Sequence, residues 1–266
     1  MYASRFMAGI GRVVLAAAAA IGISSAASAE TTLDKVLRTK TMTVANSFAY
    51  APFGYVENGK PSGFDVDLGE EIARRMGVEV KWEKIDFKGI IAALTSGRVD
   101  ALITAMTWSP ERAERILFSA PYYDAGIGAA YREGKPIAKP EELAGKVVGL
   151  QLGSAGDRWT RDNYGSAVKE IKSYDEILLA LKDLDSGRVE VVVSALPAVK
   201  YAMRNMPAIR VTPVWDGRVV GINTRKDDTA LMAEFDSHLA ALKAEGFLDK
   251  LEAKWFGPAK SAMAAQ

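Results

Sequence analysis

The chain has 266 residues with 34 Lys and Arg, 33 Asp and Glu, one His and no Cys, and 49% of its residues are hydrophobic. This composition excludes collagen, a largely disordered chain and a disulfide scaffold, and the net charge of +1 gives no electrostatic reason to expect nucleic acid. The absence of Cys and the single His also exclude zinc sites built on Cys, Cys nucleophiles and most catalysis by His. The length suits one large domain or two domains of roughly 100–150 residues.

The first predicted element is a secretory signal peptide over residues 1–29. Arg5 and Arg12 supply its positive start, residues 13–23 are an apolar run, and residues 27–29 (ASA) fit the cleavage site. The apolar run is too short for a membrane anchor, which needs about 20 residues. No Cys follows it that would carry a lipid anchor. We therefore expect a protein that is exported through a cleaved signal peptide.

In the rest of the chain, short β-rich apolar runs alternate with helical patterns. Between residues 65 and 76 the apolar residues recur at the spacing of a helix face, and Gly77 follows as a stop signal. The alternation predicts an α/β fold with a mostly parallel sheet. The predicted strands are residues 41–45, 78–82, 100–106, 146–151 and 189–194. The predicted helices are residues 65–76, 87–94, 173–186, 229–244 and 247–255.

An internal repeat indicates two lobes of similar construction. Residues 94–103 read LTSGRVDALI and residues 184–193 read LDSGRVEVVV. Each segment consists of a helix end, a Ser-Gly-Arg-Val turn, an acid and an apolar strand. Ligands of open α/β sheets lie at the carboxyl ends of the strands. Residues 104–107 and 194–195 are therefore the first places to look for a ligand site.

Arg112 is the strongest single candidate for binding an anion. Ser109 and Pro110 predict a helix start, with Ser as the N-cap and Pro in the first turn. A cation in the first turn opposes the helix dipole at a cost of about 0.3–1 kcal/mol, so it is better placed to hold an anion beside the helix N–H groups. The alternative is an exposed Arg that pairs with Glu111 or Glu114.

Aromatic side chains form a second group of candidates. Tyr50 and Phe53 follow the first predicted strand, and Phe87 and Trp108 belong to the same class. Such rings stack on small ligands and bury a large area. Ordinary loop packing is the alternative for each of them.

Two further motifs carry weaker signals. The acids of residues 65–71 could hold a metal ion, but Asp65 or Asp67 is better explained as a helix cap. The Gly-rich turn of residues 149–156 lacks the phosphate-binding patterns, so backbone N–H groups facing a carboxylate are its better explanation. We expect neither a metal nor a cofactor.

Taken together, these segments resemble the bacterial solute-binding proteins that serve polar amino acid ABC transporters (family 3, with the type II periplasmic binding fold). The resemblance covers nearly all of the chain after the signal peptide. The order and spacing of the segments are far more specific than any one of them. The matching segments are residues 50–53, 63–68, 96–101, 107–112, 118–123, 143–149 and 151–154.

The resemblance implies two α/β lobes joined by two hinge strands, with the ligand in the cleft between the lobes. By analogy, residues 31–123 and 217–258 form lobe one, and residues 126–214 form lobe two. The partners implied are a small-molecule ligand and the permease subunits of an ABC transporter at the membrane, without nucleic acid. The protein is expected to be a monomer.

The resemblance also assigns roles to individual residues in the cleft. Arg112 would form a bidentate pair with the α-carboxylate of the ligand, and the turn at Ser154 and Ala155 would donate backbone N–H groups to it. Tyr50 would stack on the ligand. The Ala105 carbonyl and the Thr107 hydroxyl would face the ammonium. The remaining expected ligand-binding residues are Phe87, Ser47, Trp108 and Ala195.

Three positions depart from the family pattern. Members usually carry an Asp at the position of Ala195, where it pairs with the α-ammonium, and Ser194 beside it is neutral too. Ala155 replaces a hydroxyl residue, and Ser47 stands where many members have Asp. An unpaired buried ammonium is costly. Either another acid such as Asp157 reaches into the cleft, or the ligand is not an ordinary α-amino acid.

Three functions are compatible with these residues. The first is a periplasmic binding component that captures a small carboxylate-bearing solute, an amino acid above all, by lobe closure and delivers it to a permease. The second is an enzyme similar to the cyclohexadienyl dehydratases, which needs a general acid in the cleft, such as Asp124, Asp157 or Asp175. The third is a ligand-sensing domain, which is normally tethered to a membrane helix and a signalling module.

Overall fold

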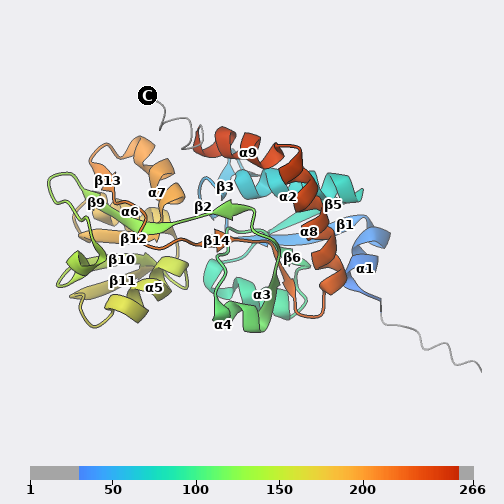
Figure 1. Ribbon diagram of the computed structural model, residues 1–266, viewed down its shortest axis with the longest axis horizontal. Coiled ribbons are helices and arrows are strands. Elements are labelled where there is room, and N and C mark those ends of the chain that lie inside the picture. Colours follow the sequence, from blue (N-terminus) through green and yellow to red (C-terminus); the bar gives the residue numbers. More distant parts are fainter. Residues whose placement is uncertain (1–29, 258–266) are drawn as a thin grey trace, which may run out of the picture. The chain divides into compact units, whose positions relative to one another are not determined.

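The computed structural model describes residues 30–257 and contains two five-stranded sheets (Figure 1). The predicted signal peptide, residues 1–29, lies outside the described residues. Within residues 30–257 no helix is long and apolar enough to cross a membrane.

In the first sheet four strands run in one direction and one runs opposite to them. It consists of β1 (Thr41–Asn46), β5 (Glu79–Lys84), β6 (Ala101–Leu102), β7 (Ile116–Phe118) and β15 (Asn223–Arg225). The order is β5-β1-β6-β15-β7. β1 runs parallel to β5 and β6, whereas β15 pairs antiparallel with β6 and β7. Four of the five strands therefore run in the same direction, as expected of a mostly parallel sheet, and β15 is the exception.

Helices cover both faces of this sheet, because alternate residues of its strands are apolar on opposite faces. Val44 belongs to one buried cluster and its neighbour Ala45 to another. The helices that pack into the first cluster are α1 (Thr32–Thr39), α2 (Phe64–Met76), α8 (Thr229–Ala244) and α9 (Phe247–Phe256). On the opposite face lie η1 (Phe87–Gly89), α3 (Ile90–Thr95) and α4 (Pro110–Arg115).

The second sheet repeats this plan. Its strands are β9 (Ile127–Arg132), β10 (Val147–Gln151), β11 (Glu170–Tyr174), β12 (Val191–Ala195) and β13 (Ile209–Val211), in the order β11-β10-β12-β9-β13. β10 runs parallel to β11 and β12, and β9 pairs antiparallel with β12 and β13. The helices of this part are α5 (Ala155–Tyr164), α6 (Ile177–Asp185), α7 (Leu196–Ala202), η2 (Pro140–Leu143) and η3 (Met203–Asn205).

Two short paired strands link the sheets along the chain. β8 (Tyr123–Asp124) leads from the first sheet to the second, and β14 (Val219–Val220) leads back, pairing antiparallel with β8. The two-lobed α/β fold is thus confirmed, and each sheet falls within one predicted lobe. The exact lobe boundaries stay a prediction, because the described residues from Thr31 onward form one compact unit. A small three-stranded sheet, β2 (Ala49–Tyr50), β3 (Gly54–Glu57) and β4 (Lys60–Ser62), completes the fold.

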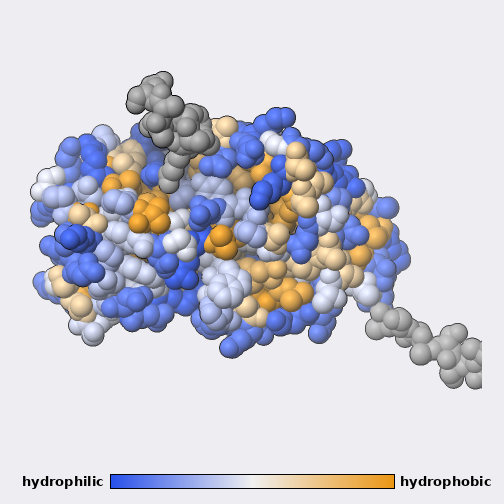
Figure 2. Space-filling model, viewed as in Figure 1, coloured by the Kyte–Doolittle hydropathy of each residue, from blue (hydrophilic) through white to orange (hydrophobic). Residues whose placement is uncertain are grey.

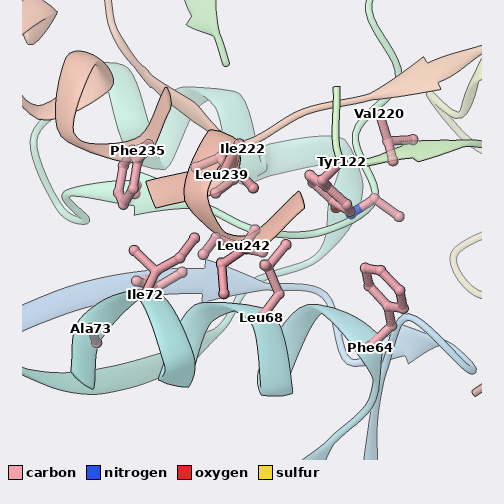
Figure 3. Packing of buried hydrophobic residues seen from close by; sticks show 14 of the residues in the cluster. Phe64, Leu68, Ile72, Ala73, Tyr122, Val220, Ile222, Phe235, Leu239 and Leu242 are labelled. Atoms are coloured by element: carbon pink, nitrogen blue, oxygen red, sulfur yellow. The ribbon is translucent and has the colours of Figure 1, made fainter. Parts of the chain in front are cut away.

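The largest apolar cluster lies between α2, α8 and the first sheet. Figure 3 shows Leu68 and Ile72 of α2 pointing toward Leu239 and Leu242 of α8, and all four are at most 3% exposed. Full burial of each such side chain contributes about 1.5–3 kcal/mol relative to exposure. The face drawn in Figure 2 is covered mainly by hydrophilic residues, with apolar residues in short patches between them.

Most predicted elements are confirmed to within a few residues, and two are wrong in extent. The strand predicted over residues 100–106 is limited to β6, because only Ala101 and Leu102 pair with the neighbouring strands β1 and β15. The helix predicted over residues 173–186 begins only at Ile177, because residues 173 and 174 pair with β10 as part of β11.

The predicted capping of α2 by an acid is also wrong. Its N-cap is Gly63, and no side chain caps the helix. Asp65 is fully buried, and Asp67 instead accepts hydrogen bonds from Lys254 and Trp255 of α9. Both acids in this turn therefore serve tertiary contacts.

The repeated Ser-Gly-Arg-Val turns are confirmed as equivalent helix ends. Gly97 follows α3 with a φ of 78°, and Gly187 follows α6 with a φ of 81°. Glycine adopts this left-handed conformation without strain, which ends the helix and starts the next strand.

Substitution of Leu68 tests the packing of this cluster. Leu68→Ala leaves a cavity between α2 and α8, so we expect the free energy of unfolding in urea to fall by about 2–5 kcal/mol. Leu178→Ala, on the 41% exposed Leu178 of α6, is the control and should change it by less than about 0.5 kcal/mol. Equal losses in both variants would contradict the packing described.

Candidate functional site

The carboxyl ends of two parallel strands from each sheet meet around a small cavity, which we call the inner cavity. The segments after β1, β6, β10 and β12 all contribute to its wall. Its volume of about 20 Å³ is little more than one water molecule needs, roughly 10–15 Å³. The lining residues are Tyr50, Phe53, Phe87, Thr104, Ala105, Thr107, Ala125, Gln151, Ser154, Ala155, Gly156, Ser194 and Ala195.

Tyr50 connects the two halves of the molecule through this cavity. Its ring stacks on Phe53 at a centroid distance of 5.9 Å and also packs against the apolar cluster of the second sheet. The Tyr50 hydroxyl lies 3.2 Å from Ser194 Oγ. Burial raises the pKa of Tyr50, although the Ser194 hydroxyl and the Ala195 backbone oppose the shift by hydrogen bonding. A phenol thus occupies the space directly beside Ala195.

Arg112 of α4 is the buried cation of the site. It is 2% exposed, and the helix start predicted from Ser109 is confirmed, since the Ser109 side chain accepts from the Arg112 N–H. Its Nη1 donates to the carbonyl and hydroxyl oxygens of Thr107 at 2.7 and 2.8 Å. Its Nη2 donates to the Gly153 carbonyl of the second half at 2.9 Å. Within residues 30–257 the Arg112 Nε has no hydrogen-bond partner.

The charge of Arg112 is poorly compensated. Burial and the positive charges of Arg158 and Arg218 lower the pKa of Arg112 to about 9. The Glu111 carboxylate raises this pKa, but its effect is smaller. Arg112 stays protonated at neutral pH. Its guanidinium also lies 5.5 Å from the centroid of the Phe87 ring. A ligand carboxylate here would supply the missing counter-charge.

The first turn of α5 faces the inner cavity with backbone donors. Ser154 is the N-cap, and its side chain accepts from the Asp157 N–H. The N–H groups of Ala155 and Gly156 lie in the first turn, where a helix has no internal acceptors. A Cβ on Gly156 would lie 2.6 Å from the Val193 carbonyl oxygen, so only glycine lets α5 approach β12 this closely.

The inner cavity has no carboxylate among its described lining residues. Asp157 is buried but turned away, since it accepts from the Gly153 N–H at 2.9 Å and pairs with Arg161 at 2.6 Å. Asp175 pairs with Lys88 at 2.8 Å. Asp124 lines a different cavity, beside β8 and α9. None of the acids considered from the sequence therefore takes the place of the acid missing at Ala195.

A buried network behind the cavity wall was missed in the sequence. Asp65 accepts from the Tyr122 hydroxyl at 2.8 Å, and that hydroxyl accepts from the Ala105 N–H at 3.1 Å. Asn46 Nδ2 lies 3.4 Å from the same carboxylate and 2.6 Å from the Ile103 carbonyl. Asp65 thereby holds the strained Ala105 in place. The acid-rich motif was the available signal, but it favoured a helix cap.

The structure brings most of the expected ligand-binding residues together. Arg112 lies against Thr107 and Gly153 and lines a neighbouring cavity. Ser47 is buried next to Thr104 but does not line the inner cavity, and Trp108 is 46% exposed. The residues that line the inner cavity as expected are Tyr50, Phe87, Ala105, Thr107, Ser154, Ala155 and Ala195.

Comparison with known proteins identifies relatives over most of the chain. The model of the bacterial extracellular solute-binding proteins, family 3, matches residues 42–258. The L-cystine-binding protein TcyJ of Escherichia coli (strain K12) is 30% identical over 253 residues, which cover 93% of this chain and 94% of that protein.

Solved structures show the same likeness. An ancestral arginine-binding protein bound to arginine has a TM-score of 0.78 and 35% identity, over 82% of this chain and 99% of its own. The ancestral amino acid-binding protein AncCDT-1, a precursor of cyclohexadienyl dehydratase, has a TM-score of 0.80 and 30% identity, over 85% and 100%. The first two of these names specify L-cystine and arginine, and the third specifies no particular amino acid.

Asp65 predicts a pH dependence of stability. Burial raises its pKa from 3.8 to about 7, against the hydrogen bonds from Tyr122, Ala105 and Asn46. The folded state therefore holds a proton that the unfolded state releases, so this contribution to stability is complete below about pH 4 and is lost as the pH rises through about 7. Between pH 5 and 8 we expect the unfolding free energy of the wild type to fall more steeply than that of Asp65→Asn. Each proton accounts for a slope of at most about 1.4 kcal/mol per pH unit.

Urea unfolding at a series of pH values measures this difference. Glu70→Gln, an exposed position on the same helix, is the control and should keep the wild-type slope. Parallel curves for the wild type and Asp65→Asn would contradict the assignment of a protonated Asp65.

Proposed function

The chain belongs to family 3 of the bacterial extracellular solute-binding proteins, and we propose that it binds its solute through a carboxylate held by Arg112. The protein is the solute-binding component of an ABC transporter system and passes a small molecule to the permease. The observation that carries the proposal is the buried guanidinium, 2% exposed, whose Nη1 and Nη2 are held by neutral acceptors and which has no carboxylate bonded to it among the described residues.

The ligand carboxylate replaces the contacts that Arg112 makes across the cleft. Its Nη2 is held by the carbonyl of Gly153, a neutral acceptor. A carboxylate is a stronger partner, because charge-assisted and bidentate hydrogen bonds are about twice as strong as neutral ones. The N–H groups of Ala155 and Gly156 reach the same anion from the second lobe. A ligand bound in this way touches both lobes, so it favours the closed arrangement over the open one.

The closed arrangement described here must open before a solute can enter. A volume of about 20 Å³ leaves no room for an amino acid. The Tyr50 ring fills the space between Phe53 and Ser194. We propose that separation of the lobes breaks the Tyr50–Ser194 contact and that the ring then stacks on the ligand.

Amino acids are the first candidate class, because the relatives named above bind amino acids. The second candidate is a carboxylic acid without an α-amino group. The neutral lining around Ala195 favours it, since no described acid faces the inner cavity and a buried ammonium without a partner is costly. Gln151, Thr104 and Ser194 offer neutral polar partners to either class.

The chain is a binding component and not an enzyme, because the relatives named above are binding proteins. Elimination of water and CO₂, as in a cyclohexadienyl dehydratase, needs a general acid that touches the substrate. Asp65 has the raised pKa of such an acid, but it does not line the inner cavity and is hydrogen-bonded to Tyr122 and Asn46. The resemblance to a dehydratase precursor therefore does not extend to a general acid in the lining.

Location and assembly follow the family. Proteins of this family act outside the cytoplasmic membrane. We further propose that residues 1–29 are removed on export, that the lobes comprise residues 31–123 with 217–258 and residues 126–214, and that the mature protein is a monomer.

Removal of the guanidinium tests the proposed anchor. Arg112→Ala should weaken ligand binding by about 2–5 kcal/mol, the usual result of truncating one partner of a buried charge pair. Titration calorimetry on refolded, ligand-free protein measures the loss. Arg98→Ala, on an exposed Arg paired with Glu83, is the control and should bind as the wild type does. An unchanged affinity of Arg112→Ala removes Arg112 from the site.

A panel of paired ligands separates the two candidate classes. Each L-amino acid is compared with its des-amino analogue in a thermal-shift assay, where a ligand at 100 times its Kd stabilises the fold by about 2.7 kcal/mol. Ala195→Asp places a carboxylate beside Tyr50, so we expect it to shift the preference toward the amino acid by about tenfold or more. An unchanged preference in this variant would show that position 195 does not face the α-carbon of the ligand.

A further inference from the structure

A second cavity, which we call the outer cavity, lies between the lobes and is strongly cationic. Its volume is about 230 Å³, and it shares the Phe87 ring with the inner cavity. Lys88, Arg112 and Arg115 line it from the first lobe, and Arg158 lines it from the second. Glu111 is the one acid in its described lining. Arg112 was expected in the ligand cleft, whereas the other cations of this cavity belong to no part of the proposed carboxylate site.

The cations of the outer cavity are incompletely paired. Arg158 Nη1 lies 3.5 Å from Glu111, and its Nη2 is buried without an acceptor. The Nε of Arg112 is buried without an acceptor as well. The exposed Arg115 side chain makes no ion pair or hydrogen bond with the part of the chain that the structure describes. Lys88 has the shortest ion pair of these cations, to Asp175 at 2.8 Å.

Buried N–H donors without acceptors indicate a missing partner. Native structures satisfy nearly all such groups, and an unpaired donor of a charged group is the most costly kind. The repulsion of Arg158 and Arg218 contributes to the lowered pKa of Arg112, which shows that the local field is positive. An anion between Arg112 and Arg158 would satisfy both donors and offset this field.

We propose that the outer cavity is a second anion site, distinct from the proposed carboxylate position in the cleft, and that it takes a small oxyanion group such as phosphate, sulfate or a carboxylate. The guanidinium groups of Arg112 and Arg158 approach it from opposite lobes, with Arg115 at its rim. Such an anion bridges the lobes, so its binding adds to the stability of the closed arrangement. This second anion site rests on one part of the proposed function, the closure of the lobes, because the outer cavity forms when the lobes are closed.

The oxyanion has two possible sources. A free inorganic anion can enter the outer cavity beside the solute. Alternatively, the transported ligand carries a second acidic group that reaches past Phe87 from the cleft. The same cations would bind the anion from either source. The two sources differ in whether the protein prefers a ligand with a second acidic group.

Titration calorimetry with inorganic phosphate, in a chloride-free buffer at neutral pH, tests the site on the mature protein. The variants are the double substitution Arg115→Gln with Arg158→Gln, and Arg98→Gln as the matched control outside the cavity. Circular dichroism and the Tm establish that each variant is folded. If the anion is free, the wild type and Arg98→Gln bind phosphate, and the double variant binds it at least about tenfold more weakly.

A second arm compares glutamate with glutamine, which have the same shape and differ in one acidic group. If the anion belongs to the ligand, the wild type prefers glutamate and the double variant loses that preference by about tenfold. The proposal is overturned if phosphate does not bind and glutamate is not preferred, or if the double variant behaves as the wild type in both arms. Failure of the proposed function is distinguishable, because it removes amino acid and carboxylate binding altogether while leaving the phosphate titration readable.

Discussion

The site depends on one buried cation. Arg112 is withdrawn from water and bonded to a carbonyl and a hydroxyl of Thr107 in its own lobe and to the Gly153 carbonyl of the other lobe. Burying a charge without a counter-charge is unfavourable by several kcal/mol. The fold tolerates this cation by surrounding it with neutral acceptors. These acceptors are weaker partners than a carboxylate, and we propose that this difference in strength makes the closed arrangement responsive to an anionic ligand.

The architecture explains why the contact can form only across the cleft. Arg112 lies in a short helix after β6, and Gly153 lies in the turn between β10 and α5. Both segments follow the carboxyl ends of parallel strands, where open α/β sheets place their ligands. Tyr50 and Ser194 form a second contact of the same kind. In the proposed function, closure and ligand recognition use the same side chains, so that binding of the ligand changes the arrangement of the lobes.

Local signals in the sequence were sufficient for most of the helices and strands, whereas the place of Arg112 in a ligand cleft was expected only from the family resemblance. The helix start at Ser109 and Pro110 and the repeated Ser-Gly-Arg-Val turns are determined within a few residues. The inward turn of Asp65 was not predictable, because its environment is formed by Tyr122 and Asn46, which lie far along the chain. The short β6 and the late start of α6 were missed for a similar reason, since strand pairing decided both against local pattern.

The most direct test of the account is a crystal structure of the mature protein with the ligand that stabilises it most. The account predicts both oxygens of a ligand carboxylate at about 2.7–2.9 Å from the Arg112 guanidinium. It also predicts that the Gly153 carbonyl is released from Arg112 and that the Tyr50 hydroxyl is separated from Ser194. A ligand whose carboxylate lies elsewhere, with Arg112 still bonded to Gly153, would contradict it.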